Sequence, residues 1–163
     1  SLDIGFSGYD LFKESKQSNQ KKILVLKKYK FGLATLVIAI PEQWIDVQTI
    51  ADLEEIAFDF KDRKNKRLRV ATKYPNLTKE FLFSKGVTQF KLVESLGATE
   101  TYPFTGSSEI ISDITSSGET LKANNLRVLK DGKILISQAC MFSSKISLKK
   151  NEIKKFTKIF TKN

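Results

Sequence analysis

A short polar segment in the last third of the chain has the residue types and spacing of an anion-binding site. The apolar residues 110–111 lead to Asp113, and the residues that follow place three hydroxyl groups around a glycine: Ser116, Ser117, Gly118 and Thr120. A strand-to-helix turn presents unpaired backbone N–H groups and the positive end of a helix dipole. Asp113, at the carboxyl end of the strand, is placed to hold ribose hydroxyls or a magnesium ion beside a phosphate. The segment predicts a sugar-phosphate site, although a plain helix N-cap uses the same residue types.

The chain contains no histidine and a single cysteine, which limits the chemistry available to it. A Ser-His-Asp triad and histidine zinc ligands are excluded. Carboxylates, hydroxyls, lysines and the backbone remain, and they suit transfers whose leaving group is already activated, such as magnesium-bound pyrophosphate, where positioning and electrostatics supply most of the rate. The apolar neighbours of Cys140 predict a buried strand cysteine and not a nucleophile, and one cysteine fits a reducing compartment.

The length of 163 residues, with 40% hydrophobic residues, suffices for one domain or two small lobes with a real core. The longest apolar run, residues 33–40, ends at Pro41 and is too short to cross a bilayer. The first residues, 1–5, are not a basic segment followed by an apolar stretch, so no signal peptide is visible. These features predict a cytoplasmic protein without a membrane partner.

The net charge of +10 lies almost entirely after residue 121. Residues 147–162 are predicted to form an amphipathic helix with lysines outside its apolar side. A nucleic-acid interface would be expected to place stacking aromatic residues among the lysines, whereas Phe156 and Phe160 are expected on the apolar side of this helix. A solvated lysine face is therefore favoured over a nucleic-acid partner.

Strand-like and helix-like segments alternate along the chain, so the predicted class is α/β, with the ligand outside the carboxyl ends of the strands. The dipeptide Asp131-Gly132 predicts a hairpin turn, and the lysine-rich residues 60–66 predict a surface loop. Trp44 is expected to be a packing residue. The predicted strands are residues 2–6, 23–29, 35–40, 68–71, 87–93, 110–114, 126–129 and 133–142; the predicted helices are 8–15, 49–58 and a segment from about 76 to 86, before the final helix.

Taken in order, several motifs resemble those of the ATP phosphoribosyltransferase family, which opens histidine biosynthesis. The opening turn is similar to the family's D-(L/I)-V-x-(S/T)-G-x-T-L-x-A-N-G-L signature, and the other matching segments keep the family's order over most of the chain. They are residues 4–10 (IGFSGYD), 36–41 (LVIAIP), 69–78 (RVATKYPNLT), 85–87 (KGV), 97–100 (GATE) and 137–140 (SQAC).

The resemblance implies a fold of two α/β lobes like the type II periplasmic binding proteins. Residues 1–34 would form part of lobe I, residues 35–112 lobe II, and residues 113–163 the return to lobe I with the C-terminal amphipathic helix. It also implies a reaction in which N1 of ATP displaces pyrophosphate from phosphoribosyl pyrophosphate. Magnesium would be held through the substrate diphosphate, without a set of direct protein ligands.

The family's functional residues carry over to matching positions here. The 5-phosphate would bind the turn of Ser116, Ser117, Gly118, Glu119 and Thr120. Asp113 would hold the ribose hydroxyls, with Glu109 in the same ribose and magnesium vicinity. Asp113 and Glu100 are the catalytic candidates; further candidates for the cleft are Asp10, Lys73 and Tyr74. Lys91 is a candidate phosphate contact or a surface charge.

Some positions depart from the family pattern. Family members begin with a strand and a basic loop, whereas this chain enters later in the first lobe, which predicts either a fragment or a reduced product. Glu119 occupies a usually small or hydroxylic position, where its charge would repel phosphate unless it points to solvent. Asn125 replaces a glycine and is expected to tolerate a left-handed backbone.

The absence of a further domain after Asn163 predicts the family's short form, which works as a homo-oligomer or with a regulatory subunit related to histidyl-tRNA synthetase. The alternative is a non-catalytic module that binds a sugar phosphate or nucleotide, or an inactive partner subunit of the same fold.

Overall fold

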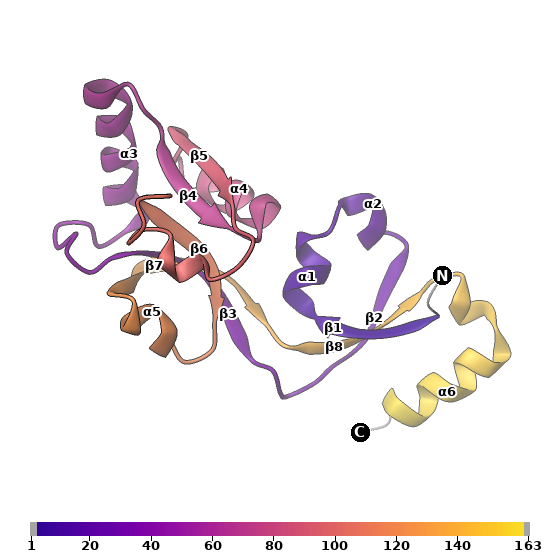
Figure 1. Cartoon of the computed structure of the whole chain (residues 1–163). Coiled ribbons are helices and arrows are strands. Elements are labelled where there is room, and N and C mark those ends of the chain that lie inside the picture. Colours follow the sequence, from indigo (N-terminus) through magenta and orange to yellow (C-terminus); the bar gives the residue numbers. More distant parts are fainter. Residues whose placement is uncertain (1–2, 162–163) are drawn as a thin grey trace. The chain divides into compact units, whose positions relative to one another are not determined.

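The computed structural model describes residues 3–161, and for Thr161 only the backbone. Contacts between residues divide the chain into two compact units, which are described separately (Figure 1). Unit 1 comprises residues 1–33 and 137–163, and unit 2 comprises residues 34–136. The sequence predicts a return to the first lobe at residue 113, whereas the contact boundary lies at residue 137. The reason is that the strands around residues 110–136 all pair within unit 2.

Unit 2 is built on a five-stranded mixed sheet. Its order is β5-β4-β6-β3-β7, with β4 parallel to β5 and β6, and β3 antiparallel to β6. The strands are β3 (Ala34–Pro41), β4 (Leu68–Thr72), β5 (Phe90–Glu94), β6 (Ile110–Thr115) and β7 (Leu126–Ser137). The carboxyl ends of β4, β5 and β6 consequently meet at one edge of the sheet, where a ligand site is expected in such folds.

Alternating side chains of these strands form two apolar cores, one on each face of the sheet. Ile38, Val70 and Ile110 pack with residues of α3 (Ile50–Lys64) and α4 (Pro75–Ser84) on one face. Their neighbours in sequence, including Ala71 and Ile111, pack on the other face with α5 (Glu119–Ala123). The period of two along a strand explains this division, and sheets buried on both faces require nearly continuous apolar runs.

Helix α3 begins at a capping box and ends later than predicted. Thr49 Oγ1 accepts a hydrogen bond from Asp52 N, and Asp52 Oδ2 accepts from Thr49 N at 2.8 Å. The prediction of a surface loop at residues 60–66 is wrong over its first part, because α3 continues to Lys64 before Asn65 turns left-handed at φ 49°. Lysine and arginine are good helix formers, and their charges favour the last turn of a helix.

The predicted hairpin at Asp131-Gly132 is wrong, because β7 runs unbroken through both residues. Asp131 Oδ1 instead accepts a hydrogen bond from Ile50 N at 2.8 Å, at the start of α3. Gly132 is buried, and a Cβ atom there would lie 3.1 Å from the carbonyl oxygen of Ile38. Asp131 therefore caps a helix, and Gly132 allows two strands to approach closely. Turn statistics over a few residues do not distinguish these roles from a hairpin turn.

Unit 1 contains a three-stranded antiparallel sheet of order β1-β8-β2. Its elements are β1 (Ile4–Gly8), α1 (Tyr9–Glu14), α2 (Gln17–Gln20), β2 (Ile23–Lys28), β8 (Ala139–Ser144), a 3-10 turn η2 (Ser147–Lys149) and α6 (Asn151–Thr161). Leu2 and Lys162, at the ends of two predicted elements, lie outside the described residues. Cys140 is fully buried on β8, as predicted, and burial raises the pKa of its thiol.

Trp44 packs against the core formed with α3, as predicted. Asn125 has φ 54°, in the left-handed region that the sequence led us to expect. Among the described residues, none of the helices has the length and apolar composition that a bilayer crossing requires.

Candidate functional site

Parallel pairing aligns the carboxyl ends of β4 and β6 and so assembles the candidate site in unit 2. Thr72 is in register with Ser112, and Asp113 is the next residue of β6. Beyond β4 the chain continues through Lys73 and Tyr74 into α4; beyond β6 it enters the hydroxyl-rich turn. Two of the segments singled out from the sequence therefore begin side by side at one edge of the sheet.

Asp113 is partly buried and holds its carboxylate with local donors. Oδ1 accepts a hydrogen bond from Ile114 N at 2.8 Å, and the hydroxyl of Thr99 also donates to the carboxylate. Desolvation by burial raises the pKa of Asp113 above its usual value, and the nearby charge of Glu100 adds to this rise, while the hydrogen bonds and Lys73 oppose it. Glu100 and Lys73 thus lie close enough to Asp113 to affect its pKa.

Thr99 is a residue of this site to which the sequence assigned no role. Its side chain is fully buried, and its hydroxyl lies 2.8 Å from the hydroxyl of Ser95. A carboxylate only accepts hydrogen bonds, so Thr99 must donate to Asp113 and receive from Ser95. The left-handed Ala98, at φ 44°, begins the 3-10 turn η1 (Thr99–Thr101) that carries this residue. The sequence signal that could have identified Thr99 was the GATE motif, in which it directly precedes Glu100.

A second set of buried hydroxyls joins the strand ends beneath the site. Thr78 Oγ1 donates to Ser112 Oγ at 2.8 Å and lies 3.3 Å from Thr72 Oγ1, which accepts from Tyr74 N at 2.9 Å. These contacts connect β4, β6 and the start of α4 without any charged group. A buried network with every member satisfied holds its parts rigidly, so the two strand ends form a fixed base for the loops above them.

The turn after β6 is stabilised mainly by its own hydroxyls. Thr115 Oγ1 accepts from Gly118 N at 2.9 Å, whereas Ser117 Oγ accepts from Glu119 N only at 3.4 Å. Gly118 adopts φ 80°, which costs a side-chain-bearing residue more than glycine. Helix α5 has five residues, so its dipole is weaker than the sequence argument supposed. The hydroxyls and N–H groups of the turn are therefore the main hydrogen-bond donors available to an anion. Ser116, Ser117 and Thr120 are exposed.

The other predicted site residues have different surroundings. Lys73 is exposed, whereas Tyr74 is buried and packs with Leu36 and Leu77. Glu119 is exposed, the condition under which its charge is compatible with a phosphate in the turn. Tyr74 therefore supports the site from the core side.

Asp10 belongs to unit 1, where it is buried at 6% exposure. Its carboxylate accepts a hydrogen bond from Ser137 Oγ at 2.5 Å, and its backbone N–H donates to the same oxygen at 2.9 Å. This pair of contacts ties the start of α1 to the segment that precedes β8. Within unit 1, Asp10 thus has a structural role, and a role toward a ligand stays a prediction.

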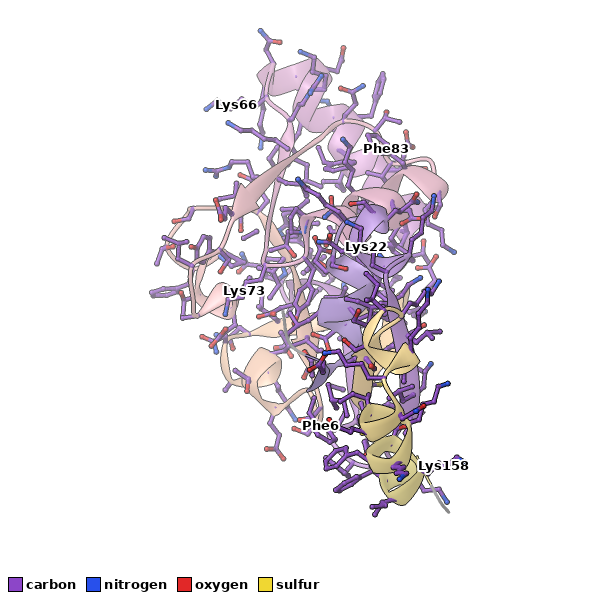
Figure 2. The ribbon with its side chains drawn as sticks, turned by 90° about the vertical axis from the view of Figure 1, so that its right-hand side faces the viewer. Phe6, Lys22, Lys66, Lys73, Phe83 and Lys158 are labelled. Atoms are coloured by element: carbon purple, nitrogen blue, oxygen red, sulfur yellow. The ribbon has the colours of Figure 1, made fainter. Side chains whose placement is uncertain are left out.

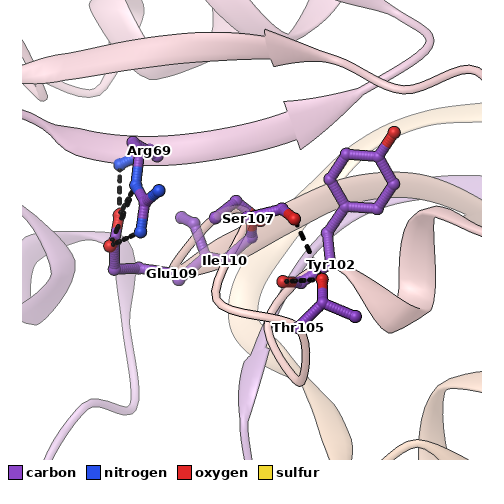
Figure 3. Close-up of polar contacts among 7 residues, drawn as sticks. Arg69, Tyr102, Thr105, Ser107, Glu109 and Ile110 are labelled. Carbon is purple, nitrogen blue, oxygen red and sulfur yellow. Dashed lines mark hydrogen bonds and ion pairs between the residues drawn. The ribbon is translucent and has the colours of Figure 1, made fainter.

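Glu109 lies at the amino end of β6, away from Asp113. Four residues of extended strand separate the two by about 13 Å. The Glu109 carboxylate instead accepts hydrogen bonds from Arg69 Nη2 at 2.6 Å, from Arg69 Nε, and from the backbone N–H of Arg69 at 2.7 Å (Figure 3). The geometry thus does not support the expected place of Glu109 beside the ribose, because its carboxylate is bonded to Arg69 and holds the start of β6 to β4.

No group of three or more carboxylate or cysteine side chains suited to a metal ion occurs within residues 3–161. Magnesium commonly binds one or two protein carboxylates together with substrate phosphates and waters. Asp113 and Glu100, the two neighbouring carboxylates at this edge of the sheet, fit that mode of binding.

Comparison with known proteins gives the chain its family. The model of the family described as "HisG: ATP phosphoribosyltransferase" matches residues 1–162. Proteins named ATP phosphoribosyltransferase from Chelativorans sp. (strain BNC1) and Brucella anthropi are 49% and 47% identical to it over 146 residues. These matches cover 89% of the chain and 64% and 63% of the relatives, so the chain spans just under two-thirds of their length.

Two solved structures are also similar. An ATP phosphoribosyl transferase (HisG:HisZ) complex from Thermotoga maritima matches with a TM-score of 0.71 and 26% identity, over 98% of this chain and 68% of that one. The probable amino-acid ABC transporter extracellular-binding protein ytmK of Bacillus subtilis matches with a TM-score of 0.51 and 10% identity, over 90% and 60%, which concerns the fold alone. The predicted class, a two-lobed α/β fold like the type II periplasmic binding proteins, is confirmed. By its sequence and its fold, the chain belongs to the ATP phosphoribosyltransferase family.

Proposed function

We propose that this chain carries the site of an ATP phosphoribosyltransferase, which joins N1 of ATP to the anomeric carbon of phosphoribosyl pyrophosphate and releases pyrophosphate. The observation that carries the proposal is the juxtaposition of Asp113, hydrogen-bonded by Thr99, with the exposed hydroxyl-rich turn that follows it. Both lie at the carboxyl ends of the parallel strands, in a chain that belongs to this family.

In this proposal the turn binds the 5-phosphate through hydroxyl and backbone N–H donors of Ser116, Ser117, Gly118 and Thr120. The long contact between Glu119 N and Ser117 Oγ is the one that a phosphate oxygen would replace at least cost. Asp113 accepts hydrogen bonds from the ribose hydroxyls, which requires its ionised form. Lys73, exposed and near Asp113, supplies positive charge toward the diphosphate.

Magnesium on the diphosphate would neutralise the charge that develops on the departing pyrophosphate. Asp113 and Glu100 are the residues that would orient it. The roles of the protein's own groups are then to fix the sugar phosphate, to orient the ribose and to hold a negative charge near the anomeric carbon. Positioning of this kind supplies much of the rate when the leaving group is already activated.

The partner implied by this function is a second subunit. The similar Thermotoga maritima structure is described as a HisG:HisZ complex, and we infer that this chain also acts in a homo-oligomer or with a regulatory subunit related to histidyl-tRNA synthetase. A cytoplasmic location follows from the proposed substrates, because ATP and phosphoribosyl pyrophosphate are cytoplasmic metabolites.

The test is calorimetric titration of the chain with phosphoribosyl pyrophosphate and magnesium. We expect saturable binding that Ser117→Ala/Thr120→Ala weakens about 10- to 100-fold, since each lost hydrogen bond to a charged group contributes roughly 1.5–3 kcal/mol and water replaces part of it. The matched control is Thr105→Ala/Ser107→Ala, which removes an exposed hydroxyl pair elsewhere in unit 2. Equal binding by all three proteins would contradict the proposed phosphate turn.

The alternative is a non-catalytic module that binds the same sugar phosphate. The departure that favours it is Glu119, a carboxylate at a position that is usually small or hydroxylic in the family. The two are separated by ATP-dependent release of pyrophosphate, measured with the chain alone and with its regulatory partner. The module would be favoured if the chain bound phosphoribosyl pyrophosphate but released no pyrophosphate under either condition, and if Glu119→Ala behaved in the same way.

A further inference from the structure

A basic pocket lies at the amino ends of the parallel strands in unit 2, at the opposite edge of the sheet from the proposed catalytic turn. It has a volume of about 590 Å³, within the usual range for small-molecule sites. Its lining comes from the end of α3, the loop before β4, and the first residues of β4 and β5. The lining residues are Phe60, Lys64, Lys66, Arg67, Arg69, Lys91 and Glu109.

The charges of this pocket are strongly unbalanced. Five of its seven lining residues are cationic, and one is anionic. The single carboxylate, Glu109, already accepts three hydrogen bonds from the side chain of Arg69 and one from its backbone. Arg69 is thereby fixed in place, and Glu109 has little capacity left to neutralise the remaining cations.

The remaining cations are close together for structural reasons. Arg69 and Lys91 are cross-strand neighbours in register on β4 and β5, so their side chains leave the same face of the sheet. Arg67, in the loop directly before β4, lines the same pocket. Within residues 3–161, the ion pairs include none from Lys64, Lys66, Arg67 or Lys91.

Phe60 and Lys64 form the helical wall of the pocket. The Nζ of Lys64 lies over the Phe60 ring, 4.1 Å from its centroid, and the ring also packs against the core. The face of this ring is therefore occupied, which leaves little stacking surface for a nucleobase. The acidic residue of the preceding turn, Asp59, pairs with Arg63 and does not line the pocket.

From these features we propose that the pocket binds a chain of linked phosphates, either inorganic or as the polyphosphate group of a nucleotide. Like-charged side chains held together on a fixed frame repel one another, and a compact multivalent anion removes that repulsion. Lysine and arginine are the usual ligands of phosphate oxygens. The inference does not depend on the proposed catalytic function, because it uses none of the residues of the catalytic turn.

The location also separates the two sites. Lys66 and Lys73, both marked in Figure 2, flank β4 at its amino and carboxyl ends. The first belongs to the basic pocket and the second to the neighbourhood of Asp113. A phosphate bound at one end would therefore not occupy the other.

The test titrates the chain with inorganic tripolyphosphate, without magnesium, and follows the heat of binding and the fluorescence of Trp44. Trp44 is the single tryptophan and lines an adjoining depression that Phe60 and Lys64 also line. We expect saturable binding at one site that Lys66→Gln/Arg67→Gln/Lys91→Gln weakens at least about tenfold, since the variant removes three charged contacts to phosphate.

Two control variants make the result specific. Lys154→Gln/Lys155→Gln/Lys158→Gln removes the same number of positive charges from exposed positions of α6, in unit 1, and should leave binding within about twofold. Ser117→Ala/Thr120→Ala should also leave it unchanged, which separates the pocket from the catalytic turn. Thermal unfolding of each variant verifies that it is folded.

Further ligands distinguish the source of the phosphates. Adenosine triphosphate binding no tighter than tripolyphosphate in the Ser117→Ala/Thr120→Ala background would assign the site to the phosphates alone, and tighter binding would assign it to a nucleotide. Equal weakening of tripolyphosphate binding by the triple variant of the pocket and by the triple variant of α6 would overturn the proposal, because binding would then follow net charge. Much tighter binding of a single-stranded oligonucleotide, spread over many residues, would overturn it in favour of a nucleic-acid surface.

Discussion

Two carboxylates of unit 2 have the same chemical group but different surroundings and therefore different roles: Glu109, directly before β6, and Asp113, near the carboxyl end of β6. Glu109 is held by the guanidinium and the backbone N–H of Arg69, so its charge is neutralised within the fold. Asp113 has a neutral hydroxyl and one N–H as donors, with Lys73 only nearby. The first carboxylate joins two strands, and the second keeps acceptor capacity for a ligand.

The charge around each carboxylate also differs between the two edges of the sheet. At the amino edge, cations outnumber the single carboxylate. At the carboxyl edge, Asp113 lies near both Glu100 and Lys73, and the neutral hydroxyls of Thr99 and Ser95 lie beside it. An edge with excess cations suits a bare polyanion, whereas an edge with carboxylates and hydroxyls suits a sugar phosphate that brings its own magnesium. Four predictions test this contrast.

The largest effect is expected for Asp113→Asn. Loss of an ionised acceptor for the ribose hydroxyls should weaken phosphoribosyl pyrophosphate binding about 10- to 100-fold. Tripolyphosphate binding at the basic pocket should stay unchanged, and titration calorimetry measures both. A loss of both activities would show that the two edges are not independent.

The second prediction concerns Glu109→Gln. The amide cannot match the charge-assisted contacts with Arg69, so we expect destabilisation of about 1–2 kcal/mol. Urea unfolding measures this change, and phosphoribosyl pyrophosphate binding should remain within twofold of the original. Weakened binding without destabilisation would instead return Glu109 to the ribose site, where the sequence placed it.

A smaller effect is expected for Thr99→Val, which removes the hydroxyl donor to Asp113 while keeping the side-chain shape. The pKa of Asp113 should rise further, and binding of the sugar phosphate should weaken about 2- to 10-fold. Thr99→Ser should restore both. Carboxyl NMR of Asp113 follows the pKa without an activity assay, and an unchanged pKa in the valine variant would contradict the positioning role.

The smallest effect concerns pH. Burial raises the pKa of Asp113 from 3.8, so the folded state holds this proton more tightly than the unfolded state. Its contribution to stability is fully present below 3.8 and is lost as pH rises through the raised value. Asp113→Asn should therefore gain stability relative to the original chain as pH rises to neutrality, and should equal or trail it in acid. Parallel thermal unfolding curves across this range measure the difference, and a constant difference would contradict it.

Much of this protein follows from its sequence alone. Most strand and helix positions in unit 2, the buried Cys140 and the left-handed Asn125 were predictable, because apolar periodicity and backbone preference act over a few residues. The order of motifs also identified the family before any contact was known. Asp113 and its turn could be singled out for the same reason, since strand, carboxylate, hydroxyls and glycine are consecutive.

Only the tertiary structure decided what these residues contact. Asp131-Gly132 is a dipeptide typical of hairpin turns. In the fold, however, the Asp131 carboxylate accepts a hydrogen bond from the start of α3, and the backbone of β3 lies close to where a side chain at position 132 would be. Glu109 looks like a partner of Asp113, yet pairing of β4 with β6 places Arg69 against it. Thr99 reaches Asp113 across a gap of fourteen positions that no local pattern spans. Hydrogen bonds and ion pairs between distant segments depend on which strands are neighbours, and that information belongs to the fold as a whole.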